Sequence, residues 1–213
     1  MIRSTLGIIL CLTACGSLLP HEKPSGRAAP GFLSSYNNLR PDQTRPDVLV
    51  WRLDSADFAS YDSVLVEMPL LRRRADDSLP SPVECAALCT QLQGAVQSAL
   101  SPHWKLIHEL PSDAQSRSQV LRVKVAVTSA LHDNGDLPPN GQWQLWTDHP
   151  RNFAFECEVL DGSNARPLAK LVSFDRTHLI QHTQITPWSD IQPVFPAWSA
   201  DVEWLIRPRK PPA

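Results

Sequence analysis

Two segments in the second half of the chain alternate apolar and polar residues with a period of two, and this pattern constrains the fold most strongly. Residues 120–128 and 153–159 each place one set of side chains on an apolar face and the other set on a polar face. A strand of this kind needs a helix layer on one side of its sheet only. The apolar sets are Leu121, Val123, Val125 and Val127, then Phe153, Phe155, Cys157 and Val159.

The remaining patterns predict a helix layer and further strands. Ser81-Pro82-Val83-Glu84 is typical of a helix start, with a serine cap, proline at the first position and a glutamate that closes a capping box. A second helix is expected from Pro196. We therefore predict a two-layer α+β sandwich, with a mainly antiparallel sheet of four to six strands and both helices on one face. The other expected strands are residues 48–51, 63–68, 104–109 and 168–174.

The polar faces of the two alternating segments carry opposite charges. Arg122 and Lys124 lie on the first segment, and Glu156 and Glu158 on the second. Opposite charges on neighbouring strands stabilise a sheet. The pattern therefore predicts that these two strands are adjacent.

The chain begins with a short secretory signal. One arginine precedes an apolar run over residues 6–12, which is too short to span a bilayer. Leu12-Thr13-Ala14-Cys15 resembles the bacterial lipobox, in which the cysteine thiol receives a diacylglyceryl group and becomes the acylated first residue. Several acyl chains on one residue give stable anchoring. We expect lipidation at Cys15; the alternative is a plain secretory signal with an incidental cysteine.

Composition and the positions of the prolines divide the chain into four parts. With 20 prolines against 8 glycines, extended connections are expected rather than glycine-rich loops. We predict a signal peptide at 1–14, a lipidated, proline-rich tether at 15–46, one domain at 47–206 and a disordered basic tail at 207–213.

The expected cellular location follows from the same N-terminal residues. Gly16 follows the cysteine. In the lipoprotein families of Gram-negative bacteria an Asp at this position usually marks inner-membrane retention, so its absence favours the outer membrane, facing the periplasm. The formal net charge of −2 argues against nucleic acid as a partner. The expected partners are the bilayer, through acylated Cys15, and an envelope protein. The sequence does not define the oligomeric state.

Three cysteines remain after the signal and the lipidation site. Cys85 and Cys89 fall on the apolar stripe of the expected helix and Cys157 on the apolar face of a strand. A disulfide of Cys157 with Cys85 or Cys89 is possible in an oxidising compartment. Buried thiols are the alternative.

The sequence contains no recognisable catalytic or metal-binding motif. No Gly-x-Ser-x-Gly elbow is present. His178 and His182 have helical spacing, but Pro187 follows and no glutamate lies between them. Residues 132–136 lack the length and terminal glutamate of a calcium loop. We assign no catalytic, cofactor or metal residue.

Trp143 and Trp146 lie in a segment bounded by proline-rich turns. If exposed, they would form a patch suited to a protein partner or the bilayer interface. The alternative is that the loop folds back and buries them.

The chain resembles a family of bacterial lipoproteins grouped as domain of unknown function 3313. The resemblance rests on residues 31–39 and 58–66, on the hairpin at 155–162, on Phe174-Asp175-Arg176 and on the helix containing Trp198, and covers roughly residues 31–206. It implies an α+β fold similar to small periplasmic accessory domains and no particular activity.

Three hypotheses for function remain. The first is a membrane-tethered, non-catalytic domain that binds an envelope partner. The alternatives are an envelope hydrolase with a site assembled from scattered residues, and a carrier of lipid or small hydrophobes in a pocket between helix and sheet.

Overall fold

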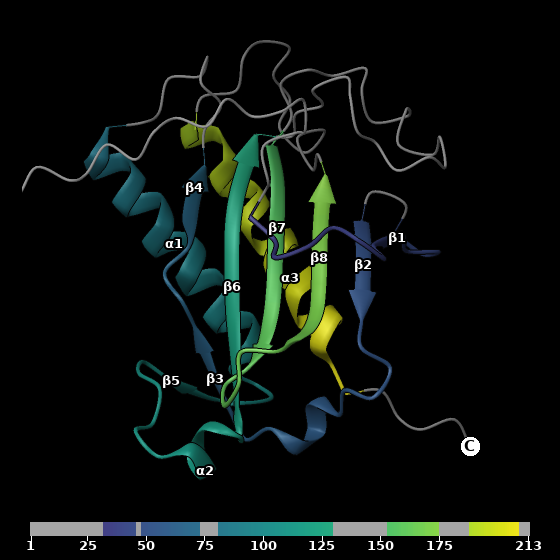
Figure 1. Ribbon diagram of the computed structural model, residues 1–213. Helices are drawn as coiled ribbons and strands as arrows, with labels where there is room; N and C mark the ends of the chain where they lie inside the picture. The colour runs from purple at the N-terminus through teal and green to yellow at the C-terminus, as the bar shows by residue number, and fades with distance from the viewer. Residues whose placement is uncertain (1–31, 46–47, 73–80, 130–152, 175–187, 209–213) are drawn as a thin grey trace, which may run out of the picture.

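The computed structural model describes residues 32–45, 48–72, 81–129, 153–174 and 188–208. One mixed sheet forms the first layer, and the helices α1 (Pro82–Leu100) and α3 (Phe195–Ile206) pack behind it on one face (Figure 1). This is the expected two-layer α+β sandwich. In the described part of the chain, no helix is long and apolar enough to cross a membrane.

Among the described residues, the sheet holds eight strands in the order β1-β2-β8-β7-β6-β3-β5, with β4 also paired to β6. The pairs β1–β2, β2–β8, β8–β7 and β7–β6 are antiparallel, whereas β3 runs parallel to β5 and β6, and β4 parallel to β6. The strands are β1 (Arg40–Pro41), β2 (Val48–Arg52), β3 (Ser63–Val66), β4 (Leu70–Arg72), β5 (Lys105–Ile107), β6 (Val120–Ser129), β7 (Phe153–Asp161) and β8 (Pro167–Phe174).

The sheet is wider than the expected four to six strands. The additional strands β1 and β4 have only two and three residues, and segments this short show no period of two in the sequence. The expected strands at 48–51, 63–68, 104–109, 120–128, 153–159 and 168–174 are confirmed as β2, β3, β5, β6, β7 and β8.

Helix α1 begins as its sequence predicts. Ser81 accepts a hydrogen bond from the backbone N–H of Glu84, and the Glu84 carboxylate accepts one from the N–H of Ser81, so both halves of the capping box form. The buried face of α1 consists of Leu88, Leu92, Val96 and Leu100. Helix α3 adds Trp198, whose ring stacks on Phe155 of β7 with centroids 5.2 Å apart.

The main core lies between the sheet and the helices. It contains the apolar faces of β6 and β7, including Val125, Phe155 and Cys157, and the buried faces of α1 and α3. The short helices η1 (Phe58–Ser60), α2 (Ala114–Arg117) and η4 (Trp188–Val194) complete the described elements.

Residues 32–45 belong to the structured part, although the sequence placed them in the tether. A second, smaller apolar cluster lies on the sheet face opposite the helices and includes Phe32, Leu33 and Leu39. Part of the segment that the sequence analysis expects as a tether therefore packs on the sheet. Hydrogen bonds of this segment reach residues of β7 that are more than 120 positions away in the sequence, and local composition cannot indicate such contacts.

Candidate functional site

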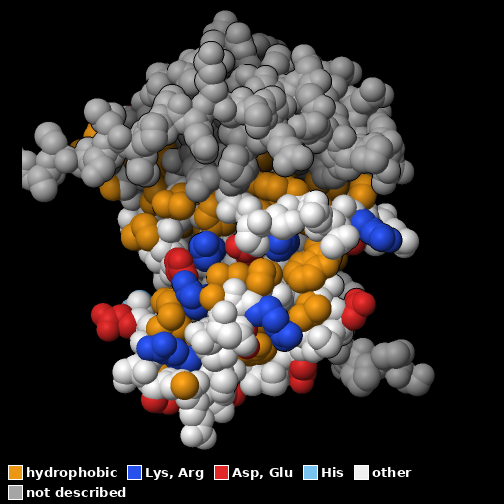
Figure 2. Space-filling view, in the orientation of Figure 1, with side chains coloured by type: hydrophobic (Ala, Val, Ile, Leu, Met, Phe, Trp, Pro, Cys, Tyr) orange, Lys and Arg blue, Asp and Glu red, His pale blue; other side chains and the backbone are white. Residues whose placement is uncertain are grey.

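Residues 32–36, which we call the clasp, cross the open face of the sheet in front of β7 and β8 (Figure 1). The open face is the one opposite the helices, and Figure 2 shows acidic and basic side chains gathered across its middle. The clasp leads into the turn at residues 37–38 and then into edge strand β1.

Two buried carboxylates of β7 hold the clasp. Glu156 and Glu158 are 4% and 2% exposed. The Glu156 carboxylate accepts hydrogen bonds from the backbone N–H groups of Phe32 (3.1 Å) and Leu33 (3.3 Å), and from the Tyr36 hydroxyl. Glu158 accepts bonds from the backbone N–H of Ser34 (3.2 Å) and from its hydroxyl. The clasp is thus bound mainly through its backbone.

Neighbouring strands complete the polar contacts. Thr128 of β6 donates to Glu156 at 2.8 Å. The Lys170 ammonium of β8 is 5% exposed, donates to the backbone carbonyl of Ser35 at 2.9 Å and lies 3.6 Å from the Glu158 carboxylate. Two buried negative charges therefore face one buried ammonium.

Apolar contacts anchor the first two residues of the clasp. Phe32 and Leu33 are 8% and 4% exposed. The ammonium of Lys124 lies 5.3 Å from the centre of the Phe32 ring, a cation–π distance. The sheet contributes small or branched side chains to this cluster, namely Leu49, Ala126, Ala154 and Val172.

Tyr36 remains protonated in this setting. Burial, and then the negative charge of Glu156, raise the pKa of Tyr36 well above its ordinary value. A neutral phenol is the form that can donate to Glu156, so the environment maintains the donor that the clasp needs.

The predicted adjacency of the charged strands is confirmed, with one difference in pairing. Lys124 stands directly opposite Glu158 on β7, but Arg122 stands opposite Leu160. Arg122 instead donates from its guanidinium to Glu67, at 2.9 and 2.5 Å. The sequence indicated the neighbouring strands but could not set their register.

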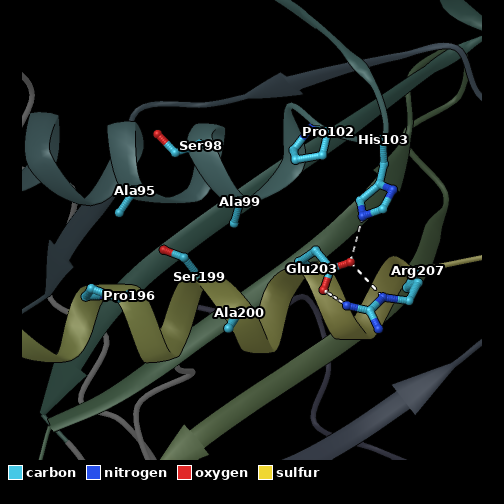
Figure 3. A pocket seen from close by; sticks show the side chains of 10 residues that line it. All are labelled: Ala95, Ser98, Ala99, Pro102, His103, Pro196, Ser199, Ala200, Glu203 and Arg207. Atoms are coloured by element: carbon cyan, nitrogen blue, oxygen red, sulfur yellow. Dashed lines mark hydrogen bonds and ion pairs between the residues drawn. The ribbon is translucent and has the colours of Figure 1, made fainter.

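The helix layer carries a shallow groove on the other side of the sheet from the clasp (Figure 3). We call it the interhelical groove; its volume is about 560 Å³. Small side chains of α1 and α3 form its walls, which leaves the two helix backbones close together. The lining residues are Ala95, Ser98, Ala99, Pro102, His103, Pro196, Ser199, Ala200, Glu203 and Arg207.

A charged cluster closes one end of the interhelical groove. The Glu203 carboxylate accepts two bonds from the Arg207 guanidinium, at 2.7 and 2.6 Å, and lies 3.0 Å from His103 Nε2. The Arg207 guanidinium, with a smaller contribution from His103, holds the pKa of Glu203 below its ordinary value. The cluster ties the end of α3 to the residues that follow α1.

The described residues contain no cluster of three or more His, Cys, Asp or Glu side chains that could hold a metal ion. His178, His182 and residues 132–136 lie outside the described residues. The same is true of Cys15 with the rest of the signal, and of Trp143 and Trp146.

The possible disulfide of Cys157 with Cys85 or Cys89 is not formed in the structure. Cys157 is fully buried at the centre of the sheet, where burial raises the pKa of its thiol. Cys89 is only half-buried and contacts the backbone of Leu71 on β4, so it lies over a different part of the sheet. The helical cysteines thus flank the core face of α1 instead of sharing the core with Cys157.

Sequence reasoning missed both the clasp and the interhelical groove. The sequence carries no signal for the clasp, because its contacts depend on a strand register that the sequence does not set. The interhelical groove follows from small side chains on two helices whose packing the sequence does not reveal.

Comparison with solved structures finds several proteins of low identity. A PelC dodecamer from Paraburkholderia phytofirmans is 14% identical with a TM-score of 0.37, covering 75% of this chain and 98% of that one. A DUF4136 family protein from Bacteroides thetaiotaomicron is 11% identical with a TM-score of 0.38, covering 75% and 97%. A PDZ domain protein from Parabacteroides distasonis is 9% identical with a TM-score of 0.44, covering 76% and 36%.

Comparison with curated proteins gives no match. A family model described as a protein of unknown function matches residues 28–138, which is just over half of the chain. The match begins just before the clasp and includes α1 and β6. The chain therefore belongs to the DUF3313 family.

Proposed function

We propose that the chain is a lipid-anchored protein of the Gram-negative cell envelope, held at the outer membrane and facing the periplasm. Its α+β domain would bind an envelope protein without catalysing a reaction. The lipobox ending at Cys15 supports the anchor, and Gly16 in place of Asp supports the outer membrane.

The observation that carries the binding role is the placement of two features on opposite faces of the sheet. The chain that leaves Cys15 reaches the domain at the clasp, on the open face. The interhelical groove is formed by the helix layer, on the other side. A domain attached at one face and hollowed on the other is suited to present that groove to a partner.

The distance between anchor and domain agrees with this role. Residues 16–31 separate Cys15 from the clasp and include Pro20, Pro24 and Pro30. At about 3.1 Å per residue for an extended, proline-rich segment, they would reach roughly 50 Å. That length would let the domain bind a partner away from the lipid surface.

The anchor is tested by labelling with radioactive palmitate and by fractionating the envelope. We expect label and membrane attachment in the unmodified chain and in Cys11→Ser, and loss of both in Cys15→Ser. Gly16→Asp should move the labelled protein to the inner membrane. Label that persists in Cys15→Ser would overturn the anchor.

The partner is tested by placing a photo-crosslinking amino acid at Ala99 in the interhelical groove, and at exposed Gln115 on α2 as the control. We expect one defined protein adduct from position 99 in the tethered chain only. Identical adducts from both positions would contradict a binding role for the groove. An adduct with lipid alone would favour a carrier.

A further inference from the structure

We propose that the sheet surface beneath the clasp is a peptide-binding site, and that its partner is the clasp of a second copy of this chain. In the structure, the site is filled by residues 32–36 of the same chain. Exchange between two copies would keep every contact of the clasp and would change only the direction of the chain at the turn that follows it.

The contacts are those of a site that binds a short, bent segment of backbone. Three consecutive backbone N–H groups, those of Phe32, Leu33 and Ser34, donate to side-chain carboxylates of β7 and not to a neighbouring strand. The hydroxyls of Ser34 and Tyr36 and the buried Phe32 ring add side-chain recognition. A covalent connection to the rest of the domain is not needed for any of these contacts.

The buried charges make release of the clasp inexpensive compared with release of an apolar segment. With the clasp bound, Glu156 and Glu158 are shielded from water. Their hydrogen bonds come from the clasp and from Thr128, and the nearby buried ammonium is that of Lys170. Burial of charge is costly unless the charge is fully paired, and the cost is recovered when water returns. Rehydration of both carboxylates therefore offsets part of the lost contact energy.

The turn after the clasp can serve as the hinge. The described backbone bond that closes it runs from the N–H of Leu39 to the carbonyl of Tyr36 and is long, at 3.4 Å. Asn38 has a φ of 69°, a left-handed conformation that asparagine tolerates. Leu39 is buried and fixes the far side of the turn, so Asn37 and Asn38 are the residues that would change conformation.

A second copy is the partner of choice because it carries the same clasp sequence. If the chain is lipid-anchored, as proposed above, confinement of the copies to one membrane surface would raise their effective concentration. This effect of the anchor rests on the proposed function. The exchange itself depends only on the clasp, the sheet surface beneath it and the turn, and it can be tested without an anchor.

The test uses two complementary variants of the full chain, both carrying Cys15→Ser. One has a disabled clasp (Phe32→Ala, Ser34→Ala, Tyr36→Phe), and the other a disabled site (Glu156→Gln, Glu158→Gln). We expect each variant to sediment as a monomer and an equimolar mixture to form a one-to-one complex. The control for the site is Glu67→Gln, which removes a carboxylate of the Arg122 pair outside the clasp and should leave self-association of the otherwise unmodified chain unchanged. A mixture that remains monomeric overturns the proposal.

Hydrogen exchange of the Cys15→Ser chain decides the matter should a multiple variant fail to fold. We expect the amides of residues 32–34 to exchange at least about tenfold faster than those of β7, because the clasp opens without global unfolding. Dimer should also accumulate as the protein concentration approaches about 1 mM. Clasp amides as slow as those of β7, or a monomer at all these concentrations, would overturn exchange. Neither result depends on whether Cys15 is acylated.

Discussion

Tyr36 joins the clasp to a buried carboxylate, and it is one of only two tyrosines in the chain. The other, Tyr61, donates to Asp161 at 2.9 Å, and burial together with Asp161 raises its pKa to about 12. Because the chain contains only two tyrosines, a tyrosinate titration followed by ultraviolet absorbance can report on each of them.

We predict that neither tyrosine ionises near pH 10, the ordinary value for this side chain, while the protein is folded. Both folded pKa values are raised, so the stability that they contribute is complete below about pH 10 and is lost as the pH rises through the folded values. Tyr36→Phe should leave one transition near the value of Tyr61, and Tyr61→Phe only the higher one. Reversible ionisation of half the tyrosine near pH 10 in the folded chain would contradict the hydrogen bond from Tyr36 to Glu156.

At the scale of the elements, periodicity predicted what local patterns can encode. The lengths of β6 and α1 and the capping box at Ser81 follow from residues close together in the sequence. The clasp does not, because Phe32 and Glu156 are 124 positions apart and neither belongs to a repeating pattern with the other. The interhelical groove was equally inaccessible, since it depends on which sides of α1 and α3 approach each other.

Two glycines illustrate how strongly the elements constrain their connections. A Cβ atom on Gly162, in the turn between β7 and β8, would lie 2.6 and 2.7 Å from the backbone carbonyl oxygens of Arg117 and Val120. On Gly94, within α1, it would meet nothing within 4 Å. The turn therefore packs against the start of β6, whereas the helix position is open.

We expect Gly162→Ala to lower the free energy of unfolding by about 2–3 kcal/mol, because backbone atoms must move to admit the methyl group. Gly94→Ala should raise it by about 0.5–1 kcal/mol, because alanine loses less conformational freedom in a helix. Urea denaturation of both variants measures the difference. Equal effects would mean that the turn does not pack against β6 as described.

Across the whole molecule, the N-terminal segment contacts both layers. The clasp lies on the open face of the sheet, and further along the same segment the Arg45 guanidinium reaches α3, donating to Asp201 at 2.5 Å. Arg45 also lies 4.5 Å from the centre of the Trp204 ring. Asp201 is 2% exposed and also accepts a bond from Ser173 of β8. The segment thus joins the edge of the sheet to the helix layer.

This arrangement predicts that the Arg45–Asp201 pair couples the N-terminal segment to the stability of the whole domain. Arg45→Met should lower the free energy of unfolding by about 2 kcal/mol. Breaking a fully buried ion pair lowers it by roughly 3–5 kcal/mol, and the loss is smaller here because 29% of the arginine side chain is exposed. A double-mutant cycle with Asp201→Asn should give a coupling of at least about 1 kcal/mol by chemical denaturation. Arg207→Met, which removes the solvent-exposed partner of Glu203, is the matched control and should cost less. If the losses of unfolding free energy in the Arg45 and Asp201 single variants simply add, the pair does not couple the N-terminal segment to the helix layer.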